Sequence, residues 1–147
     1  MRVERQALID KYANKLISTL ENILPKQPNE AEFRRHVDRL IDDFRQEAGL
    51  PEFNNMVEFT IGSGRADSVL HRVIIEYERP GTLTPDLKDR TTAHAVGQAE
   101  QYIKELSEKL AFSGRYMSAI ITDGYYIIFA RWREGRFCVD PPIKLHF

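Results

Sequence analysis

Three segments of the chain repeat apolar residues at the three- and four-residue spacing of an amphipathic helix. The first covers about residues 5–24 and is ended by Pro25, the second follows Asn29 and runs to Gly49, and the third covers about residues 92–110. Each segment gathers its apolar side chains into one stripe, which predicts that each helix packs against another element.

Shorter apolar runs predict strands between and after these helices. Three strands are expected before the third helix, and two or three after it. Asp123-Gly124 is a strong hairpin signal, and Glu134-Gly135 is expected to turn the chain into the last strand. The polar stretch from Pro80 to Arg90 is expected to be a loop, of a length that suggests function or mobility. The expected strands cover residues 57–61, 65–70, 72–78, 117–122 and 125–131, and a further strand after Glu134-Gly135 runs through Val139.

The order of these elements predicts an α/β fold with a central mixed sheet flanked by helices. The third helix can carry the chain from the strand ending at Glu78 to a parallel neighbour that starts near Met117, through a right-handed crossover. We expect one domain over residues 1–147, with an N-terminal helix in residues 1–28 and an αβββαβ core with C-terminal strands in residues 29–147.

Composition narrows the class of protein. The chain has 147 residues and one cysteine, Cys138, which cannot form an internal disulfide and so favours a reducing, cytoplasmic setting. No segment approaches the roughly 20 apolar residues of a membrane span. The net charge is −1, so any site for a polyanion must be local. Arginines do cluster locally, at Arg65, Arg72 and Arg79 and again at Arg131, Arg133 and Arg136 around Trp132, although such clusters are often only surface charge.

Acidic residues stand inside the apolar strands that meet near His71-Arg72. A two-residue turn there would pair Leu70 with Val73, and counting outward then places Asp67 opposite Glu76 and Arg65 opposite Glu78, all on one face. A slip of one residue would separate Asp67 from Glu76. The other face would be the core face, formed by Ala66, Leu70, Val73, Ile75 and Tyr77.

Two carboxylates opposed at roughly 5 Å repel each other unless a positive charge lies between them. Mg²⁺ prefers one or two carboxylates plus water and phosphate oxygens, and it can polarise a phosphodiester. Asp67 and Glu76 are therefore candidate metal ligands. The alternative is a surface ion network in which Arg65 and Arg79 neutralise the two acids.

At these residues the sequence resembles the PD-(D/E)XK nuclease superfamily, in particular the nuclease domains of type I-like restriction and DNA-methylase proteins. The resemblance spans about residues 30–132, and it implies a restriction-endonuclease-like αβββαβ core with Asp67 and Glu76 as the metal ligands. It also implies a further glutamate from the upstream helix, for which Glu30 is the better match and Glu32 the reserve. The third helix matches through Gln98, followed one turn on by Tyr102.

The sequence departs from the family pattern at Glu78, which stands where the signature has a lysine. Some nucleases of the superfamily carry a glutamate there, so the resemblance implies a general base or an additional ligand at Glu78. Arg79 or Arg65 would then contact the substrate phosphate.

These observations predict a Mg²⁺-dependent endonuclease domain, with Mn²⁺ as a second metal, that hydrolyses DNA phosphodiester bonds in a restriction-modification or DNA-processing system. The expected partners are DNA and a helicase or methyltransferase domain or subunit, with no membrane. Two alternatives stay open: a catalytically inactive nucleic-acid-binding or scaffold module of the same fold, and a module for protein interaction alone.

Overall fold

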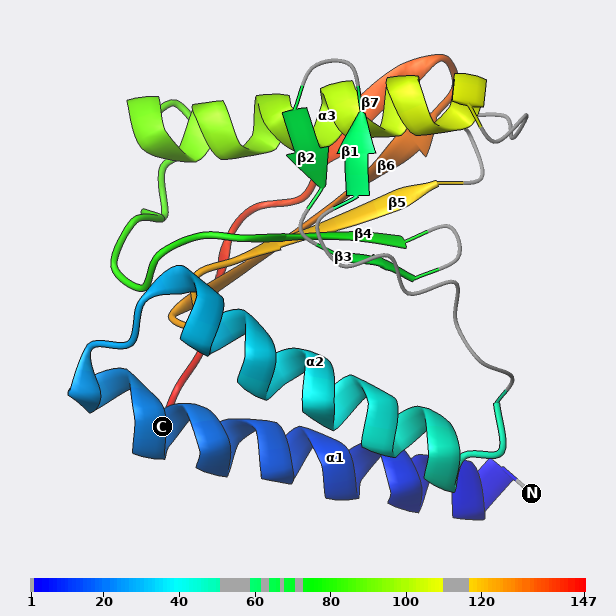
Figure 1. Ribbon diagram of the computed structural model, residues 1–147, viewed down its shortest axis with the longest axis vertical. Helices are drawn as coiled ribbons and strands as arrows, with labels where there is room; N and C mark the ends of the chain where they lie inside the picture. Colours follow the sequence, from blue (N-terminus) through cyan, green and yellow to red (C-terminus); the bar gives the residue numbers. More distant parts are fainter. Residues whose placement is uncertain (1, 51–58, 62–63, 67, 71–72, 110–116) are drawn as a thin grey trace. The chain divides into compact units, whose positions relative to one another are not determined.

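The computed structural model describes residues 2–50, 59–61, 64–66, 68–70, 73–109 and 117–147. The chain forms two compact units (Figure 1), one of Met1–Glu52 with Phe147 and one of Phe53–His146, and each is described by itself. The single domain over residues 1–147 stays a prediction.

The first unit contains two helices, as the apolar spacing predicts. Helix α1 (Arg2–Ile23) runs into a 3₁₀ turn (Leu24–Lys26), and α2 (Glu30–Glu47) follows. The Asn29 side chain accepts a hydrogen bond from the backbone N–H of Glu32 at 2.9 Å and so caps the N-terminus of α2. The two helices are joined by the Tyr12 hydroxyl, which donates to the Glu47 carboxylate at 2.6 Å.

The second unit is a mixed sheet with α3 (Arg90–Lys109) against it. The sheet order is β3-β4-β5-β6-β7, with β8 paired to β6, and β1 and β2 form a separate two-stranded sheet. Strands β4 and β5 are parallel and the other pairs are antiparallel, which confirms the mixed α/β sheet and the parallel neighbours joined through the third helix. The strands are β1 (Phe59–Ile61), β2 (Gly64–Ala66), β3 (Ser68–Leu70), β4 (Val73–Tyr77), β5 (Ser118–Thr122), β6 (Tyr126–Arg133), β7 (Arg136–Val139) and β8 (Ile143–Lys144).

The strand expected over residues 65–70 is two strands with different partners, so this prediction is wrong. Ile61 pairs with Gly64 at one end of the antiparallel pair of β1 and β2, which forms a sheet of its own. Strand β3 instead pairs with β4 in the larger sheet. The alternation of apolar residues predicted one continuous strand and did not reveal this difference in partners.

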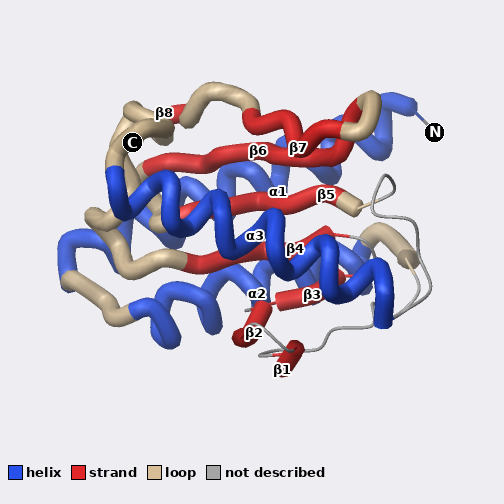
Figure 2. The backbone as a smooth tube through the Cα atoms, turned by 90° about the horizontal axis from the view of Figure 1, so that it is seen from above, coloured by secondary structure: helices blue, strands red, loops and turns tan. Residues whose placement is uncertain are grey.

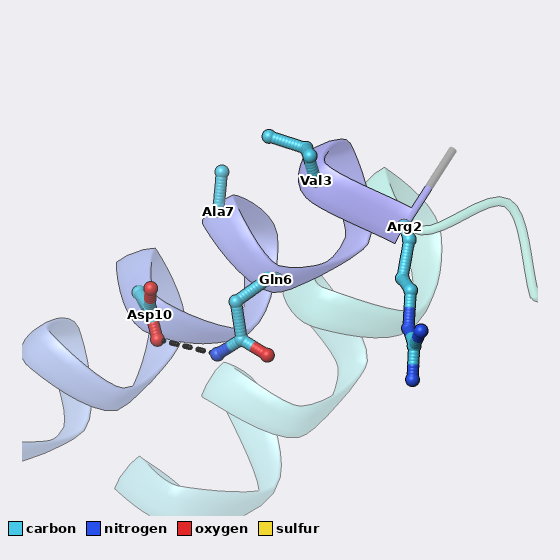
Figure 3. A pocket seen from close by; sticks show the side chains of 5 residues that line it. All are labelled: Arg2, Val3, Gln6, Ala7 and Asp10. Carbon is cyan, nitrogen blue, oxygen red and sulfur yellow. Dashed lines mark hydrogen bonds between the residues drawn. The ribbon is translucent and has the colours of Figure 1, made fainter.

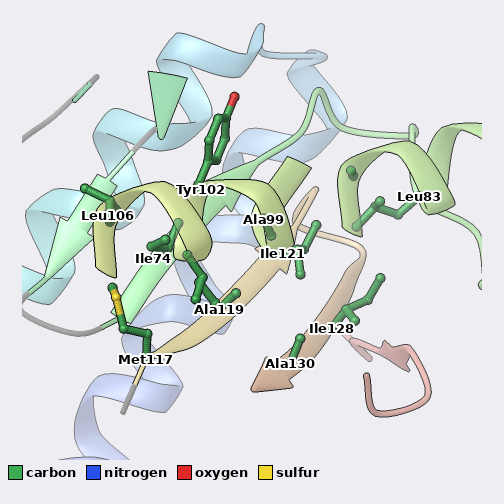
Figure 4. Close-up of a cluster of buried hydrophobic side chains, with 12 residues drawn as sticks. Ile74, Leu83, Ala99, Tyr102, Leu106, Met117, Ala119, Ile121, Ile128 and Ala130 are labelled. Atoms are coloured by element: carbon green, nitrogen blue, oxygen red, sulfur yellow. The ribbon is translucent and has the colours of Figure 1, made fainter. Parts of the chain in front are cut away.

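Helix α3 lies across one face of the large sheet (Figure 2) and encloses the core of this unit with it. Side chains from β4, β5 and β6 meet those of the helix in a buried cluster (Figure 4). On β4 the contributing residue is Ile74, which is fully buried. The cluster also contains Leu83, Ala95, Ala99, Tyr102, Ile103, Leu106, Met117, Ala119, Ile121, Ile128 and Ala130.

Both predicted hairpin turns after α3 are present. Thr122 pairs with Ile127, so the turn that contains Asp123-Gly124 is four residues long, and Gly124 takes the positive φ of +87° that glycine tolerates. Arg133 pairs with Arg136, which leaves only Glu134-Gly135 between β6 and β7.

Candidate active site

Glu76 lies in β4, the strand between β3 and β5 in the large sheet. Its side chain is 5% exposed, and its neighbours Ile74, Ile75 and Tyr77 are buried as well. A carboxylate is costly to bury in such apolar surroundings unless it is paired, hydrogen-bonded or bound to a metal. The structure therefore confirms that an acidic side chain is buried within the apolar strand.

The predicted register between β3 and β4 is confirmed for the described pairs. Leu70 lies opposite Val73 and Ser68 opposite Ile75. The two residue numbers of each pair therefore add up to the same sum as in the predicted pairing. Position 67 is the next in this count and would face Glu76. Asp67 itself lies outside the described residues, so its pairing with Glu76 stays a prediction.

The predicted pairing of Arg65 with Glu78 is wrong. Arg65 lies in β2 and faces Thr60 of β1. Glu78 instead continues the pairing of β4 with β5, since its backbone N–H donates to the carbonyl oxygen of Thr122 at 2.9 Å. The pairing fails because β2 and β4 belong to different sheets.

The expected division into one chemical face and one core face is also wrong, because both faces of β4 are covered. Ile74 belongs to the cluster beneath α3, while Ile75 and Tyr77, which point to the other side, are 4% and 1% exposed. By alternation Glu76 shares the α3 side with Ile74. Glu78, half-buried just beyond the end of β4, follows on that side.

Helix α3 carries the two residues that the resemblance singles out there. Tyr102 is 5% exposed and belongs to the core cluster, while Gln98 is half-buried one turn before it. Residues four apart lie on the same side of a helix, so Gln98 lies beside Tyr102 at the border of the buried stripe. Gln98 thus lies on the helix that covers the same face of the sheet as Glu76. A direct contact between Gln98 and Glu76 stays a prediction.

Glu30 and Glu32 lie in the first turn of α2, in the other unit. Glu30 is half-buried, whereas Glu32 is exposed and its carboxylate accepts a hydrogen bond from the Asn29 amide at 3.1 Å. Glu32 is therefore part of a helix cap. The role of Glu30 as an additional ligand stays a prediction.

The loop between β4 and α3 is held by side-chain hydrogen bonds along its length. Arg79, at its start, is exposed, and its carbonyl oxygen accepts bonds from the backbone and hydroxyl of Thr82. Leu83 is buried in the core, and the backbone N–H of Thr84 donates to the Thr92 hydroxyl of α3 at 3.1 Å. The segment after Arg79 is thus anchored to the helix. Its length alone had suggested mobility or function.

Asp123 is the buried acid whose role sequence reasoning missed. It is fully buried, and its carboxylate accepts four backbone N–H bonds, two from the β4–α3 loop and two from its own turn. The loop donors are Gly81 at 3.2 Å and Leu83 at 3.0 Å, and the turn donors are Tyr125 and Tyr126, each at 2.9 Å. These four donors satisfy both oxygens of the carboxylate, and through them Asp123 links the loop to the β5–β6 turn. The Asp-Gly pair marked the turn, but no local pattern indicated the distant donors.

Asp89 caps the N-terminus of α3. Its carboxylate accepts hydrogen bonds from the Thr91 hydroxyl at 2.7 Å and from the backbone N–H of Thr92 at 3.1 Å. These bonds stabilise the charged form, so the Thr91 hydroxyl, followed by the Thr92 N–H, lowers the pKa of Asp89. The cap fixes where the helix over the Glu76 face begins.

No cluster of three or more potential metal ligands occurs among the described residues. The donors at hand are the carboxylates of Glu76 and Glu78, which are hard oxygen ligands of the type that Mg²⁺ prefers. They fit a divalent cation in chemistry, and they would need Asp67 to complete the set implied by the resemblance.

A hollow in the first unit is lined by Arg2, Val3, Gln6, Ala7 and Asp10 of α1 (Figure 3). Along the helix the Gln6 amide donates to the Asp10 carboxylate at 2.9 Å. None of the predicted site residues lines the hollow.

Comparison with protein-family models, with curated proteins and with solved structures finds no match for this chain. Among the described residues, no helix is both long and apolar enough to cross a membrane.

Proposed function

We propose that this chain is a Mg²⁺-dependent endonuclease domain that hydrolyses DNA phosphodiester bonds. The observation that carries the proposal is the buried carboxylate of Glu76 in an interior strand of the sheet, beside β3, whose described pairs keep the register on which the predicted pairing of Asp67 with Glu76 rests. A buried carboxylate is a hard oxygen ligand of the kind that Mg²⁺ prefers. A divalent cation held together with Asp67 would give this carboxylate a chemical role.

Different side chains have different roles in the proposed reaction. Asp67 and Glu76 hold the cation, which when bound polarises the phosphodiester and acidifies water, and Mn²⁺ can replace Mg²⁺. Glu78 follows Glu76 on the same side and accepts the proton of the attacking water, in place of the charge that a lysine would supply.

Residues around the carboxylates bind and orient the substrate. Gln98 orients the site from α3, and Glu30 serves as an auxiliary ligand through water. Arg79, exposed just beyond Glu78, contacts a phosphate, and Arg65 in β2 offers a second cation. The cleavage would serve a restriction-modification or DNA-processing system with a helicase or methyltransferase partner.

The test is a nicking assay on supercoiled plasmid DNA with Mg²⁺, Mn²⁺ or a chelator. Wild type is expected to nick only with metal, and Asp67→Ala and Glu76→Gln are expected to lose at least about 100-fold in rate. Glu108→Gln is the matched control, because Glu108 is an exposed acid of the same unit. Equal nicking by wild type and Asp67→Ala would overturn the proposal.

The second candidate is a catalytically inactive nucleic-acid-binding or scaffold module of the same fold, and it is favoured by the glutamate at position 78. A glutamate cannot donate to a phosphate as a lysine can. This candidate predicts salt-sensitive DNA binding that persists in Asp67→Ala, with no cleavage in either metal.

A further inference from the structure

Strands β6 and β7 present three arginines and a phenylalanine on one face. Phe129, Arg131 and Arg133 alternate along β6 and therefore point to the same side of the sheet. Arg136 of β7 lies directly opposite Arg133, so it points to that side too. Cys138, opposite Arg131, completes the far edge of the group.

This group faces away from α3. The intervening residues of β6, Ile128 and Ala130, are buried in the cluster beneath the helix, so the residues between them project from the opposite surface of the sheet. All three arginines are exposed, and the Phe129 ring beside them is 41% exposed.

The charges of this group have no local neutralisation. Within the described residues no ion pair joins an acid to Arg131, Arg133 or Arg136. Two like charges directly opposite each other on neighbouring strands destabilise a hairpin. Glu134 in the turn and Asp140 after β7 are the nearby acids, and both are exposed. Such a surface is complementary to an anion with repeated charges.

The group is held on a rigid backbone. Glu134 and Gly135 form a two-residue turn with φ of 50° and 76°, which is the geometry that matches the twist of paired strands. The arginines are thus fixed at strand spacing, with about 7 Å between alternate residues of β6.

We propose that the β6–β7 arginine face, formed by Phe129, Arg131, Arg133 and Arg136, binds a single-stranded tract of nucleic acid. The arginines contact successive phosphates, and a base stacks on the exposed ring of Phe129. The combination of cations with an exposed ring favours a single strand, because paired bases in a duplex do not offer their faces for stacking. None of these four residues belongs to the carboxylate site, so binding itself does not depend on the proposed function. The inference rests on the proposed function only in identifying the bound strand as the substrate of the nuclease.

The experiment measures binding without cleavage. Fluorescence anisotropy with labelled oligothymidine of roughly 16 nucleotides is recorded in EDTA at about 50 and 200 mM salt. The double variant Arg133→Gln/Arg136→Gln is expected to bind at least about tenfold more weakly at the lower salt concentration. The slope of log K against log salt should fall by about 1.4, the value for two phosphate contacts on a single strand.

Two further variants separate charge from stacking. Arg2→Gln/Arg5→Gln removes two exposed arginines from α1 and is the matched charge control, expected to bind as wild type does. Phe129→Ser is expected to weaken binding about tenfold with an unchanged salt slope, because stacking releases no counterions. Arg131→Gln provides a single-site version if the double variant lowers the melting temperature.

Three results would overturn the inference: unchanged binding in the arginine variants, an equal loss in the α1 control, or tighter binding to an anionic vesicle than to the oligonucleotide. The outcome is separable from the nuclease proposal. If Asp67→Ala binds normally and wild type cuts nothing, the arginine face stands and the nuclease proposal fails. If wild type cuts and Arg133→Gln/Arg136→Gln binds normally, the nuclease proposal stands and the inference about the arginine face fails.

Discussion

The Oδ2 atom of Asp123 accepts a hydrogen bond from the backbone nitrogen of Leu83 at 3.0 Å, across forty positions of sequence. The same oxygen also accepts from Gly81, while Oδ1 serves two N–H groups of the β5–β6 turn. The loop after the candidate metal strand is therefore positioned by a fully buried carboxylate. The position of Arg79, two residues before Gly81, depends on this connection.

Removal of this carboxylate is expected to destabilise the second unit. Asp123→Ala leaves four backbone donors without their acceptor, and the free energy of unfolding should fall by about 3 kcal/mol or more, since each buried unsatisfied donor is costly. Urea unfolding followed by circular dichroism measures the change. The exposed Asp140→Ala should stay within about 0.5 kcal/mol of wild type. Equal stabilities for the two variants would contradict this role of Asp123.

The sequence predicts much of this framework and misses the long-range parts for physical reasons. The β3–β4 register follows from counting, because a two-residue connection between Leu70 and Val73 leaves one register. The pairing of Arg65 with Glu78 fails because β2 and β4 lie in different sheets, and apolar alternation does not reveal which strand is the partner. The role of Asp123 depends on donors brought together only by the tertiary fold, which no local pattern contains.

The cap of α3 gives a dependence of stability on acid pH. The folded-state pKa of Asp89 is lowered, first by the Thr91 hydroxyl, so its charged form adds stability that is present above its unfolded pKa of about 3.9. That stability is lost as the pH falls through the folded value. Asp89→Asn, which keeps a capping side chain, should therefore be less stable than wild type at pH near 7, and the difference should shrink as the pH falls below the unfolded pKa of about 3.9.

The comparison is made by thermal unfolding across that pH range. Glu21→Gln, on the exposed side of α1, is the control for removal of one acidic charge. A difference between wild type and Asp89→Asn that stays constant from neutral to acid pH would show that the charge of Asp89 contributes nothing.

The contact between α1 and α2 gives a separate dependence on alkaline pH. The Tyr12 hydroxyl donates to the Glu47 carboxylate, and this bond raises the pKa of Tyr12 to about 12. A raised pKa means that the neutral phenol adds stability below the unfolded pKa of about 10, and that this stability is lost as the pH rises through about 12. Glu47→Gln should move the pKa of Tyr12 back toward 10.

Absorbance of the ionised phenol isolates this effect. The chain has six tyrosines, so the titration of Tyr12 is obtained as the difference between wild type and Tyr12→Phe. A transition near pH 10 in that difference, or one that Glu47→Gln leaves unmoved, would contradict the role of the hydrogen bond.

Glu78 decides whether the buried carboxylate of Glu76 belongs to an active nuclease. If Glu78 accepts the proton of the attacking water, Glu78→Ala should lower the cleavage rate by about 100-fold or more, which is the usual size of general-base catalysis. Glu78→Lys, which introduces the signature residue, should retain measurable cleavage. Pre-steady-state nicking at a pH near 7 records both effects. Glu21→Lys, with the same charge change on α1, should leave the cleavage rate unchanged. Full activity in Glu78→Ala would remove Glu78 from the reaction, and the role of the base would then fall to solvent or to another acid.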